Sequence, residues 1–272
     1  MGFHLVILAF IFAIQIVAAK DVYDYSVIDV TGDERAVLVL CPGLNQNGDF
    51  FLNEKPWLNY AREHQIGLMA LSYKSDTRKL YNGEREGYYW PDQGSGDALL
   101  EAIRKEYGKD LPIFIYGFSG GAHFTSRFVE WKPERILAWT AYSAQFWDSP
   151  KSAEIMPPGI VACGELDGLR WQPTFAYFYE GRALGKPWIW ISLSETGHGR
   201  HRAFEQFIRD FFSTALEDSN IPKNLGVFVD VDTGEEYVDP DSTYQPALLS
   251  FLPTRMLLEP WGELNNIQSI NQ

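Results

Sequence analysis

The chain has few cysteines, few basic residues and, after its first segment, no long apolar run. Two cysteines among 272 residues exclude a disulfide-rich scaffold, and no cysteine spacing matches a zinc or iron–sulfur site. Lysine and arginine number 23 against 36 acidic residues, a net charge of −13. This balance argues against a nucleic-acid partner, because the phosphate backbone requires a basic surface. After residue 19 no segment approaches the ~20 apolar residues of a membrane-spanning helix, so we expect no stable span in the processed chain.

The first 19 residues are the exception, since they form an apolar run that ends at Lys20. Val17 and Ala19 are small enough for the positions before a signal-peptidase cut, which predicts a signal peptide over residues 1–19. The positive groups ahead of the run are the terminal amine and His4, without lysine or arginine, so an uncleaved N-terminal anchor is the alternative. We expect the protein to be secreted or periplasmic.

Cys41 and Cys163 each lie at the end of an expected strand. Both belong to apolar runs, where a buried free thiol is common, and we therefore expect two free thiols. A disulfide between them is the alternative, because an exported protein meets an oxidising compartment.

Apolar runs alternate with amphipathic stretches along most of the chain. Strands are expected at residues 22–30, 36–41, 66–73, 111–116, 136–142, 160–163 and 188–193. Helices are expected at residues 57–65, 95–107, 120–131, 175–184 and around 204–212. This alternation predicts an α/β fold with a mostly parallel central sheet flanked by helices. In such sheets ligands bind beyond the carboxyl ends of the strands.

The last part of the chain has a different pattern. The sequence predicts a main domain over residues 20–219 and an extension over residues 220–272 that packs on it. Within the extension, residues 226–238 predict a hairpin and residues 249–261 a short helix.

The sequence Gly117-Phe118-Ser119-Gly120-Gly121 joins an expected strand to an expected helix. In that context the pattern G-x-S-x-G is typical of a nucleophile elbow. The glycines are needed because the sharp turn strains the serine backbone, and side chains beside it would collide with the neighbouring strand or helix. An ordinary glycine-rich turn is the alternative, so Ser119 needs support from the rest of the chain.

A serine hydroxyl is a good nucleophile only when a base takes its proton and an acid orients that base. Asp167 and His198 each follow an expected strand, and His198 stands between two glycines. By itself such a histidine is more often an ordinary surface residue. The order Ser119, Asp167, His198 is nevertheless that of the α/β-hydrolase triad, and together the three predict catalysis. Glu165 and Asp148 are the alternative acids.

Attack on a carbonyl also requires two N–H donors for the oxyanion. The N–H of Gly120 is one candidate, because this residue follows the expected nucleophile. The loop after the strand 36–41 should supply the other, and Leu44 beside Gly43 is the best candidate. A plain turn at Pro42-Gly43 is the alternative.

The segment from about Val37 to Phe212 resembles an α/β-hydrolase, and within that superfamily the secreted poly(3-hydroxybutyrate) depolymerases and feruloyl or acetylxylan esterases. Residues 41–47, Cys-Pro-Gly-Leu-Asn-Gln-Asn, are similar to the strand-end motif His-Gly-Cys-x-Gln-Asn of that group, with Pro42 where histidine is usual. The resemblance implies an α/β-hydrolase fold, residues 20–219 as the catalytic domain, and Ser119, Asp167 and His198 as the triad. It specifies the superfamily well and the substrate poorly.

Aromatic residues near the expected loop ends offer flat apolar area with a polar handle, which suits aryl or carbohydrate groups. They are Tyr88, Tyr89, Trp90, Phe146, Trp147 and Trp171. Packing is the alternative for each, and Trp147 and Trp171 are the candidates for substrate binding. The stretch between Ser119 and Asp167 is too short for a large cap domain. We therefore expect an open site and a bulky or polymeric substrate.

These features predict a secreted serine hydrolase that cleaves carboxylic esters through an acyl-enzyme. Its partner would be a small-molecule or polymeric ester, and no cofactor or metal is implied. A peptidase of the same superfamily is an alternative, because a triad does not separate ester from amide cleavage. A non-catalytic binding protein of this fold is a second alternative, although binding alone requires none of the three triad residues.

Overall fold

The computed structural model of the protein describes residues 23–28, 33–73, 87–145, 147–217, 226–237 and 246–267. The expected signal peptide with its cleavage site, and Phe146, lie outside these residues. A seven-stranded sheet with the order β1-β3-β2-β4-β5-β6-β7 forms the centre. Its strands are β1 (Tyr23–Ile28), β2 (Ala36–Cys41), β3 (Ile66–Tyr73), β4 (Ile113–Phe118), β5 (Ile136–Tyr142), β6 (Gly159–Gly164) and β7 (Trp188–Leu193). All neighbours pair in parallel except β1, which runs antiparallel to β3, so the mostly parallel sheet is confirmed.

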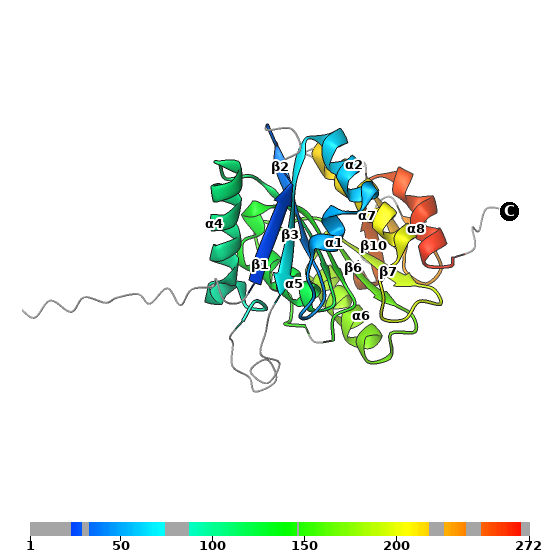
Figure 1. Cartoon of the computed structure of the whole chain (residues 1–272). Helices are drawn as coiled ribbons and strands as arrows, with labels where there is room; N and C mark the ends of the chain where they lie inside the picture. Colours follow the sequence, from blue (N-terminus) through cyan, green and yellow to red (C-terminus); the bar gives the residue numbers. More distant parts are fainter. Residues whose placement is uncertain are drawn as a thin grey trace, which may run out of the picture.

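Helices cover both faces of this sheet (Figure 1). One face carries α1 (Asp49–Leu52), α2 (Lys55–His64) and α7 (Arg202–Glu217), and the other α4 (Ser95–Tyr107), α5 (Gly120–Trp131) and α6 (Gly168–Ala183). No cap domain covers the sheet in the part of the chain that the structure describes. None of the helices within those residues is long and apolar enough to cross a membrane.

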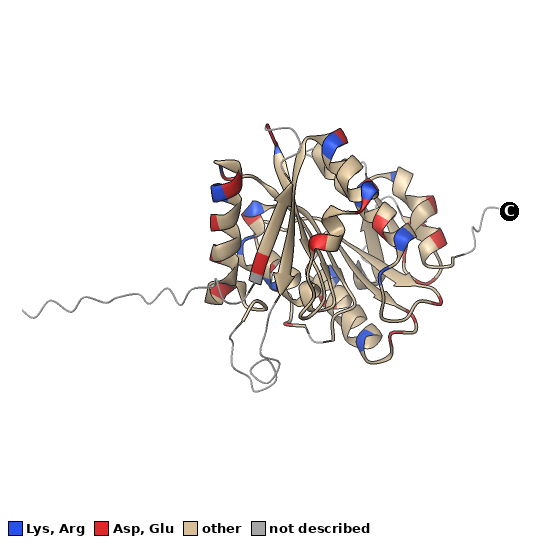
Figure 2. Cartoon of the chain, in the orientation of Figure 1, with Lys and Arg blue, Asp and Glu red and all other residues tan. Residues whose placement is uncertain are grey.

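The two-sided burial of the sheet explains its continuous apolar strands. In β2, Leu38 and Leu40 point into one core, while Val37 and Val39 point into the other. Each such side chain contributes roughly 1.5–3 kcal/mol when it is fully buried. Figure 2 shows the charged residues mostly on the surrounding helices and loops, and strands β2 to β7 contain none. Both cysteines are buried free thiols, as expected.

Helix α6 begins at Gly168, so the expected start at residue 175 is wrong. Gly168 and Pro173 resemble loop residues in the sequence, yet the helix includes both. A proline lacks the N–H that would bond to the carbonyl four residues earlier, here that of Leu169. The Leu169 residue is 79% exposed, so this turn of the helix faces solvent. The consequence is that Asp167 occupies the N-cap position directly before α6 and is not part of a long loop.

The C-terminal segments form a second, three-stranded sheet with the order β10-β8-β9. The hairpin consists of β8 (Val227–Asp230) and β9 (Glu236–Tyr237), which pair antiparallel. The single helix expected over residues 249–261 is wrong, because this stretch contains the strand β10 (Leu249–Leu252), and α8 (Leu258–Leu264) begins later. A short apolar run such as that of β10 fits helix and strand equally well, and its pairing with β8 decides between them.

These segments lie against β7, the edge strand of the main sheet. The N–H of Trp190 donates to the hydroxyl of Ser250 at 2.8 Å, and the indole of Trp261 donates to the carbonyl of Trp190 at 2.8 Å. The N–H of Ser192 donates to the side chain of Asn265 at 2.8 Å. An uncovered edge strand invites pairing with another chain, and these bonds occupy that edge.

Candidate active site

Ser119 occupies the sharp turn between β4 and α5 and has a φ of 54°. A positive φ is unfavourable for a residue with a side chain, and it places the serine backbone in a strained conformation. The neighbouring Gly121 is required because a Cβ atom there would overlap the carbonyl of Cys41 on β2. The turn therefore brings Ser119 to the carboxyl edge of the sheet, as an elbow does.

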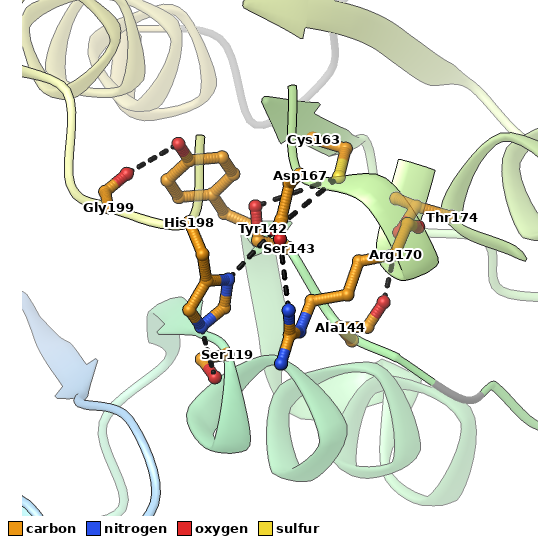
Figure 3. Close-up of polar contacts among 10 residues, drawn as sticks. All are labelled: Ser119, Tyr142, Ser143, Ala144, Cys163, Asp167, Arg170, Thr174, His198 and Gly199. Carbon is orange, nitrogen blue, oxygen red and sulfur yellow. Dashed lines mark hydrogen bonds and ion pairs between the residues drawn. The ribbon is translucent and has the colours of Figure 1, made fainter. Parts of the chain in front are cut away.

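His198 and Asp167 reach the same point from the loops after β7 and β6. The Nε2 atom of His198 lies 3.0 Å from the Oγ atom of Ser119, and its Nδ1 atom lies 2.8 Å from the Oδ2 atom of Asp167 (Figure 3). The Asp167 side chain is 3% exposed and that of His198 32% exposed. With Nδ1–H donating to the carboxylate, Nε2 is free to accept the serine proton.

The two alternative acids lie elsewhere. Asp148 forms an ion pair with Arg127, in which Nε and Oδ2 are 2.7 Å apart. The Glu165 carboxylate accepts the backbone N–H of Glu195 at 3.2 Å. Asp167 is thus the acid that the structure brings to His198.

The loop that carries His198 is held on two sides. The hydroxyl of Tyr142 donates to the carbonyl of Gly199 at 2.6 Å, and the ring of Phe118 stacks on the imidazole with centroids 5.0 Å apart. These contacts fix the ring without using its nitrogens. Sequence reasoning gave neither residue this role, because Phe118 is the variable position of G-x-S-x-G and Tyr142 belongs to no motif.

Arg200, two residues after His198, anchors the same loop through an ion cluster. Its guanidinium donates to both oxygens of Glu54, at 2.7 and 2.8 Å, and to both oxygens of Glu205, at 2.5 and 2.8 Å. Burial opposes the charge of Arg200, but the bonds to Glu54 and Glu205 outweigh it and raise the pKa of Arg200 above its ordinary value. We call these three residues the Arg200 cluster. It ties the histidine loop to α2 and α7.

Two further groups contact the carboxylate of Asp167. The Nη1 atom of Arg170 lies 3.0 Å from Oδ1, and the thiol of Cys163 lies 3.9 Å from Oδ2. Burial raises the pKa of Cys163 to about 11, so this group is a neutral thiol at physiological pH. Arg170 was not recognised in the sequence because a loop was expected there. The spacing of three residues from Asp167 becomes informative once α6 is known to begin at Gly168.

The two expected oxyanion donors lie side by side. Gly120 is the first residue of α5, so its N–H has no acceptor within the helix. A Cβ atom on Gly120 would lie 2.7 Å from the nitrogen of Leu44. The N–H of Leu44 makes no hydrogen bond with the residues that the structure describes. The side chain of Gln46 holds this loop by accepting the N–H of Gly43 at 3.0 Å, a role that sequence reasoning missed.

The aromatic candidates have packing partners. Trp147 stacks on Tyr177 with centroids 4.5 Å apart, and Trp171 stacks on Phe175 at 5.5 Å. The indole N–H of Trp171 donates to Ser192 at 2.8 Å. Both tryptophan rings are half-buried, and among the described residues no ring contact joins either to His198.

Of the other aromatic candidates that the structure describes, Tyr88 and Tyr89 are buried and Trp90 is partly buried. Tyr88 stacks face to face on Tyr73 with centroids 3.5 Å apart, and Tyr89 packs beside it. Trp90 lies against the guanidinium of Arg127, whose carbon is 4.0 Å from the ring centroid. The hydroxyl of Tyr88 lies next to Gly120, since a Cβ atom on that glycine would be 2.5 Å from it. No group of three or more potential metal ligands occurs in the described ranges.

Comparisons with known proteins give a match in structure alone. No family model matches the chain, and a search of curated proteins finds no match. The LpqC poly(3-hydroxybutyrate) depolymerase from Bordetella parapertussis has a TM-score of 0.54 and 17% identity, over 72% of this chain and 87% of its own. The esterase PE8 has a TM-score of 0.51 and 20% identity, over 72% and 96%.

A third similar structure is MGS-M1, an alpha/beta hydrolase enzyme from a deep-sea metagenome library of the Medee basin. It has a TM-score of 0.52 and 11% identity, over 72% of this chain and 99% of its own. Identities this low establish the fold and nothing finer. The order of the strands, the helices on both faces and these structural matches agree with the resemblance seen in the sequence, and the chain has the α/β-hydrolase fold.

Proposed function

We propose that the protein is a serine hydrolase that cleaves carboxylic esters, with Ser119 as nucleophile, His198 as base and Asp167 as orienting acid. The observation that carries the proposal is the continuous chain of hydrogen bonds from Oγ through the imidazole to the carboxylate, with distances of 3.0 and 2.8 Å. Burial of the acid at 3% exposure supports it, because a carboxylate shielded from water interacts more strongly with the imidazole.

In the first half-reaction Ser119 Oγ attacks the ester carbonyl carbon while His198 Nε2 takes its proton. The resulting tetrahedral oxyanion collapses, the bond to the alcohol oxygen breaks, and His198 gives the proton to the departing alcohol. Water then attacks the acyl-enzyme, again losing a proton to His198. The second collapse releases the carboxylic acid and returns the proton to Ser119.

The N–H groups of Leu44 and Gly120 are the proposed oxyanion donors. Their proximity beside Ser119 supports the pairing, and each donor in such a hole is worth roughly 2.7–4 kcal/mol of transition-state stabilisation. The close approach of the Leu44 loop also explains why position 120 holds glycine, since a larger residue would displace that loop.

A bulky or polymeric ester is the proposed substrate class. Leu166 and Leu169, on either side of Asp167, are 67% and 79% exposed, and together we call them the leucine lip. Two large apolar side chains exposed beside a candidate site favour contact with an apolar substrate surface. Trp147 and Trp171 stay a prediction as substrate contacts. Secretion, which rests on the apolar run of residues 1–19, suits a substrate too large to enter a cell.

Labelling with a fluorophosphonate probe tests the nucleophile. We expect one label, mapped to the peptide that contains Ser119, and none in Ser119→Ala. Ser149→Ala is the matched control, because Ser149 is exposed and belongs to a different loop. A protein that takes no label while correctly folded would be a binding protein rather than a hydrolase.

A panel of aryl esters and aminoacyl amides, extended to acetylated xylan, feruloylated arabinan and polyhydroxybutyrate, separates the enzymatic alternatives. We expect hydrolysis of the esters and little cleavage of the amides. Preferential cleavage of the amides would identify a peptidase and contradict the proposed activity.

A further inference from the structure

The carboxylate of Asp167 bonds to two basic side chains, one at each oxygen. Its Oδ2 atom accepts from His198 at 2.8 Å, and its Oδ1 atom accepts from Arg170 at 3.0 Å. Figure 3 shows one terminal nitrogen of the guanidinium joined to Asp167 and the other directed away from it. Because the Asp167 side chain is 3% exposed, its charge depends on these partners rather than on water.

Other donors contribute little to this carboxylate. Within the part of the chain that the structure describes, the remaining partner is the thiol of Cys163 at 3.9 Å, and a thiol is a weak donor. Asp167 is the N-cap residue of α6, yet its side chain makes no capping hydrogen bond. The carboxylate therefore accepts no backbone N–H from the helix start, and Arg170 supplies its second strong bond.

Among the described residues, the ionisable groups on or bonded to the loops of Asp167 and His198 include Cys163 on β6, Tyr142 on β5, the Arg200 cluster, and Glu165 and Glu195. Burial raises the pKa of Cys163 to about 11 and also raises that of Tyr142, so both are neutral throughout the acidic range. Arg200 is neutralised by its two glutamates, and Glu165 accepts a backbone N–H. Arg170 is the cation that bonds to the acid of the triad.

We propose that Arg170 is a positioning residue that acts on His198 through Asp167. Its bond to Oδ1 fixes the carboxylate so that Oδ2 faces the imidazole. Its positive charge also offsets part of the negative charge that would stabilise protonated His198. Removing that charge should therefore favour the protonated imidazole, which cannot accept a proton from Ser119. This inference rests on the proposed function, in which neutral His198 is the active form.

Three substitutions separate the charge of Arg170 from its hydrogen bond, with the pH dependence of kcat/KM as the readout. Arg170→Gln keeps a donor and removes the charge. The acidic limb should move to higher pH by about one unit, and the plateau should fall less than about tenfold. Arg170→Lys keeps the charge, so its limb should stay near that of the wild type. Arg170→Met removes both the charge and the donor. The acidic limb of its profile should move to higher pH, and its plateau should fall about 10- to 100-fold.

Arg202→Gln is the matched control, because it removes an exposed arginine at the start of α7 without touching the triad. Its profile should overlie that of the wild type. The inference is wrong if Arg170→Gln leaves the acidic limb in place, or if Arg170→Lys moves it as far as Arg170→Gln does. A merely structural role would lower the plateau in all three variants without moving the limb.

A second measurement needs no turnover. The ring signals of His198 can be followed by NMR in Ser119→Ala with and without Arg170→Gln, and assigned by their loss in His198→Gln. The half-titration pH should rise by about one unit when the charge of Arg170 is removed. An unchanged midpoint overturns the inference even in an active esterase. A raised midpoint in a protein that hydrolyses no ester upholds the coupling and rejects the proposed function instead.

Discussion

At the scale of single residues, Ser119, His198 and Asp167 are useful only as a unit. Ser119 has a strained φ of 54°, His198 is one-third exposed, and Asp167 is almost fully buried. Each of these states is unfavourable or unremarkable in isolation. Joined by two hydrogen bonds, they are already in the relative positions that the proposed nucleophile, base and acid require.

Substitutions in this unit should therefore be strongly non-additive. Asp167→Asn should lower turnover by about 10⁴-fold because the imidazole then favours the wrong tautomer. His198→Ala should be at least as damaging, and the double variant little worse than His198→Ala alone. Steady-state hydrolysis of an aryl ester measures all three.

Two alternative acids serve as controls for that series. Glu165→Gln and Asp148→Asn should keep most of the activity, since the first carboxylate bonds to a backbone N–H and the second to Arg127. A nearly silent Asp167→Asn combined with a collapse of either control would place the acid on another loop.

The buried thiols give a prediction about stability in alkali. Burial raises the pKa of Cys41 to about 12 and that of Cys163 to about 11, whereas both ionise near 8.5 in the unfolded chain. Folding therefore holds these protons more tightly than the unfolded state does. Their contribution to the free energy of unfolding is complete below pH ~8.5 and is lost as the pH rises towards 11–12.

Urea unfolding between pH 8 and 11 measures this loss. Burial also raises the pKa values of tyrosines such as Tyr60 and Tyr142, and their ionisation lowers the stability in the same pH range. Cys163→Ala is therefore compared with the wild type to isolate the effect of one thiol. The fall in stability with pH should be shallower in the variant. Rapid alkylation of either cysteine in the native protein at pH 8 would contradict the burial on which the prediction depends.

At the scale of elements, the sequence predicts best where one local signal suffices. The strands β2 to β7 are apolar on both faces and were all recognisable, and the glycines around Ser119 marked the elbow. The start of α6 was missed because Gly168 and Pro173 resemble loop residues, and with it Arg170 was missed. The bond from Tyr142 to Gly199 joins residues 57 positions apart, which no local pattern could reveal.

The Arg200 cluster is such a long-range feature, and it should matter for both stability and activity. Arg200→Gln removes the cation that bonds to both oxygens of the Glu205 carboxylate, which is 7% exposed. Because Glu54 is about one-third exposed and water screens part of the interaction, we expect a loss of about 2 kcal/mol of unfolding free energy. The histidine loop also loses its anchor, so kcat/KM should fall at least about tenfold.

An exposed ion pair provides the comparison for that variant. Arg255 pairs with Glu236 while 69% exposed, so Arg255→Gln should cost less than about 1 kcal/mol and leave kcat/KM unchanged. Urea unfolding and ester hydrolysis are measured on both variants. Equal effects of the two substitutions would mean that the Arg200 cluster does not hold the histidine loop.

At the scale of the whole molecule, charged residues lie outside the buried, uncharged strands of the main sheet. The charged residues lie around a sheet whose strands β2 to β7 have none, and the net charge is −13. A surface of that sign is repelled by an anionic polymer, so charge gives no general attraction to such a substrate. Contact with the proposed uncharged, bulky ester would then come from apolar groups, and the leucine lip offers two exposed apolar side chains next to Asp167 in the sequence.

Replacing the two leucines of the lip should therefore change KM for bulky esters more than KM for small ones. In Leu166→Ser/Leu169→Ser, KM for a polymeric or long-chain ester should rise several-fold, because the apolar area buried by the substrate is lost. KM for a short aryl ester and the unfolding midpoint in urea should change little, since both side chains are already exposed to water. Met256→Ser is the matched control, because Met256 is 85% exposed but lies in the C-terminal extension. If the lip variant and the control behave alike on the polymeric ester, substrate binding does not use this surface, and the bulky substrate must be held by another part of the open site.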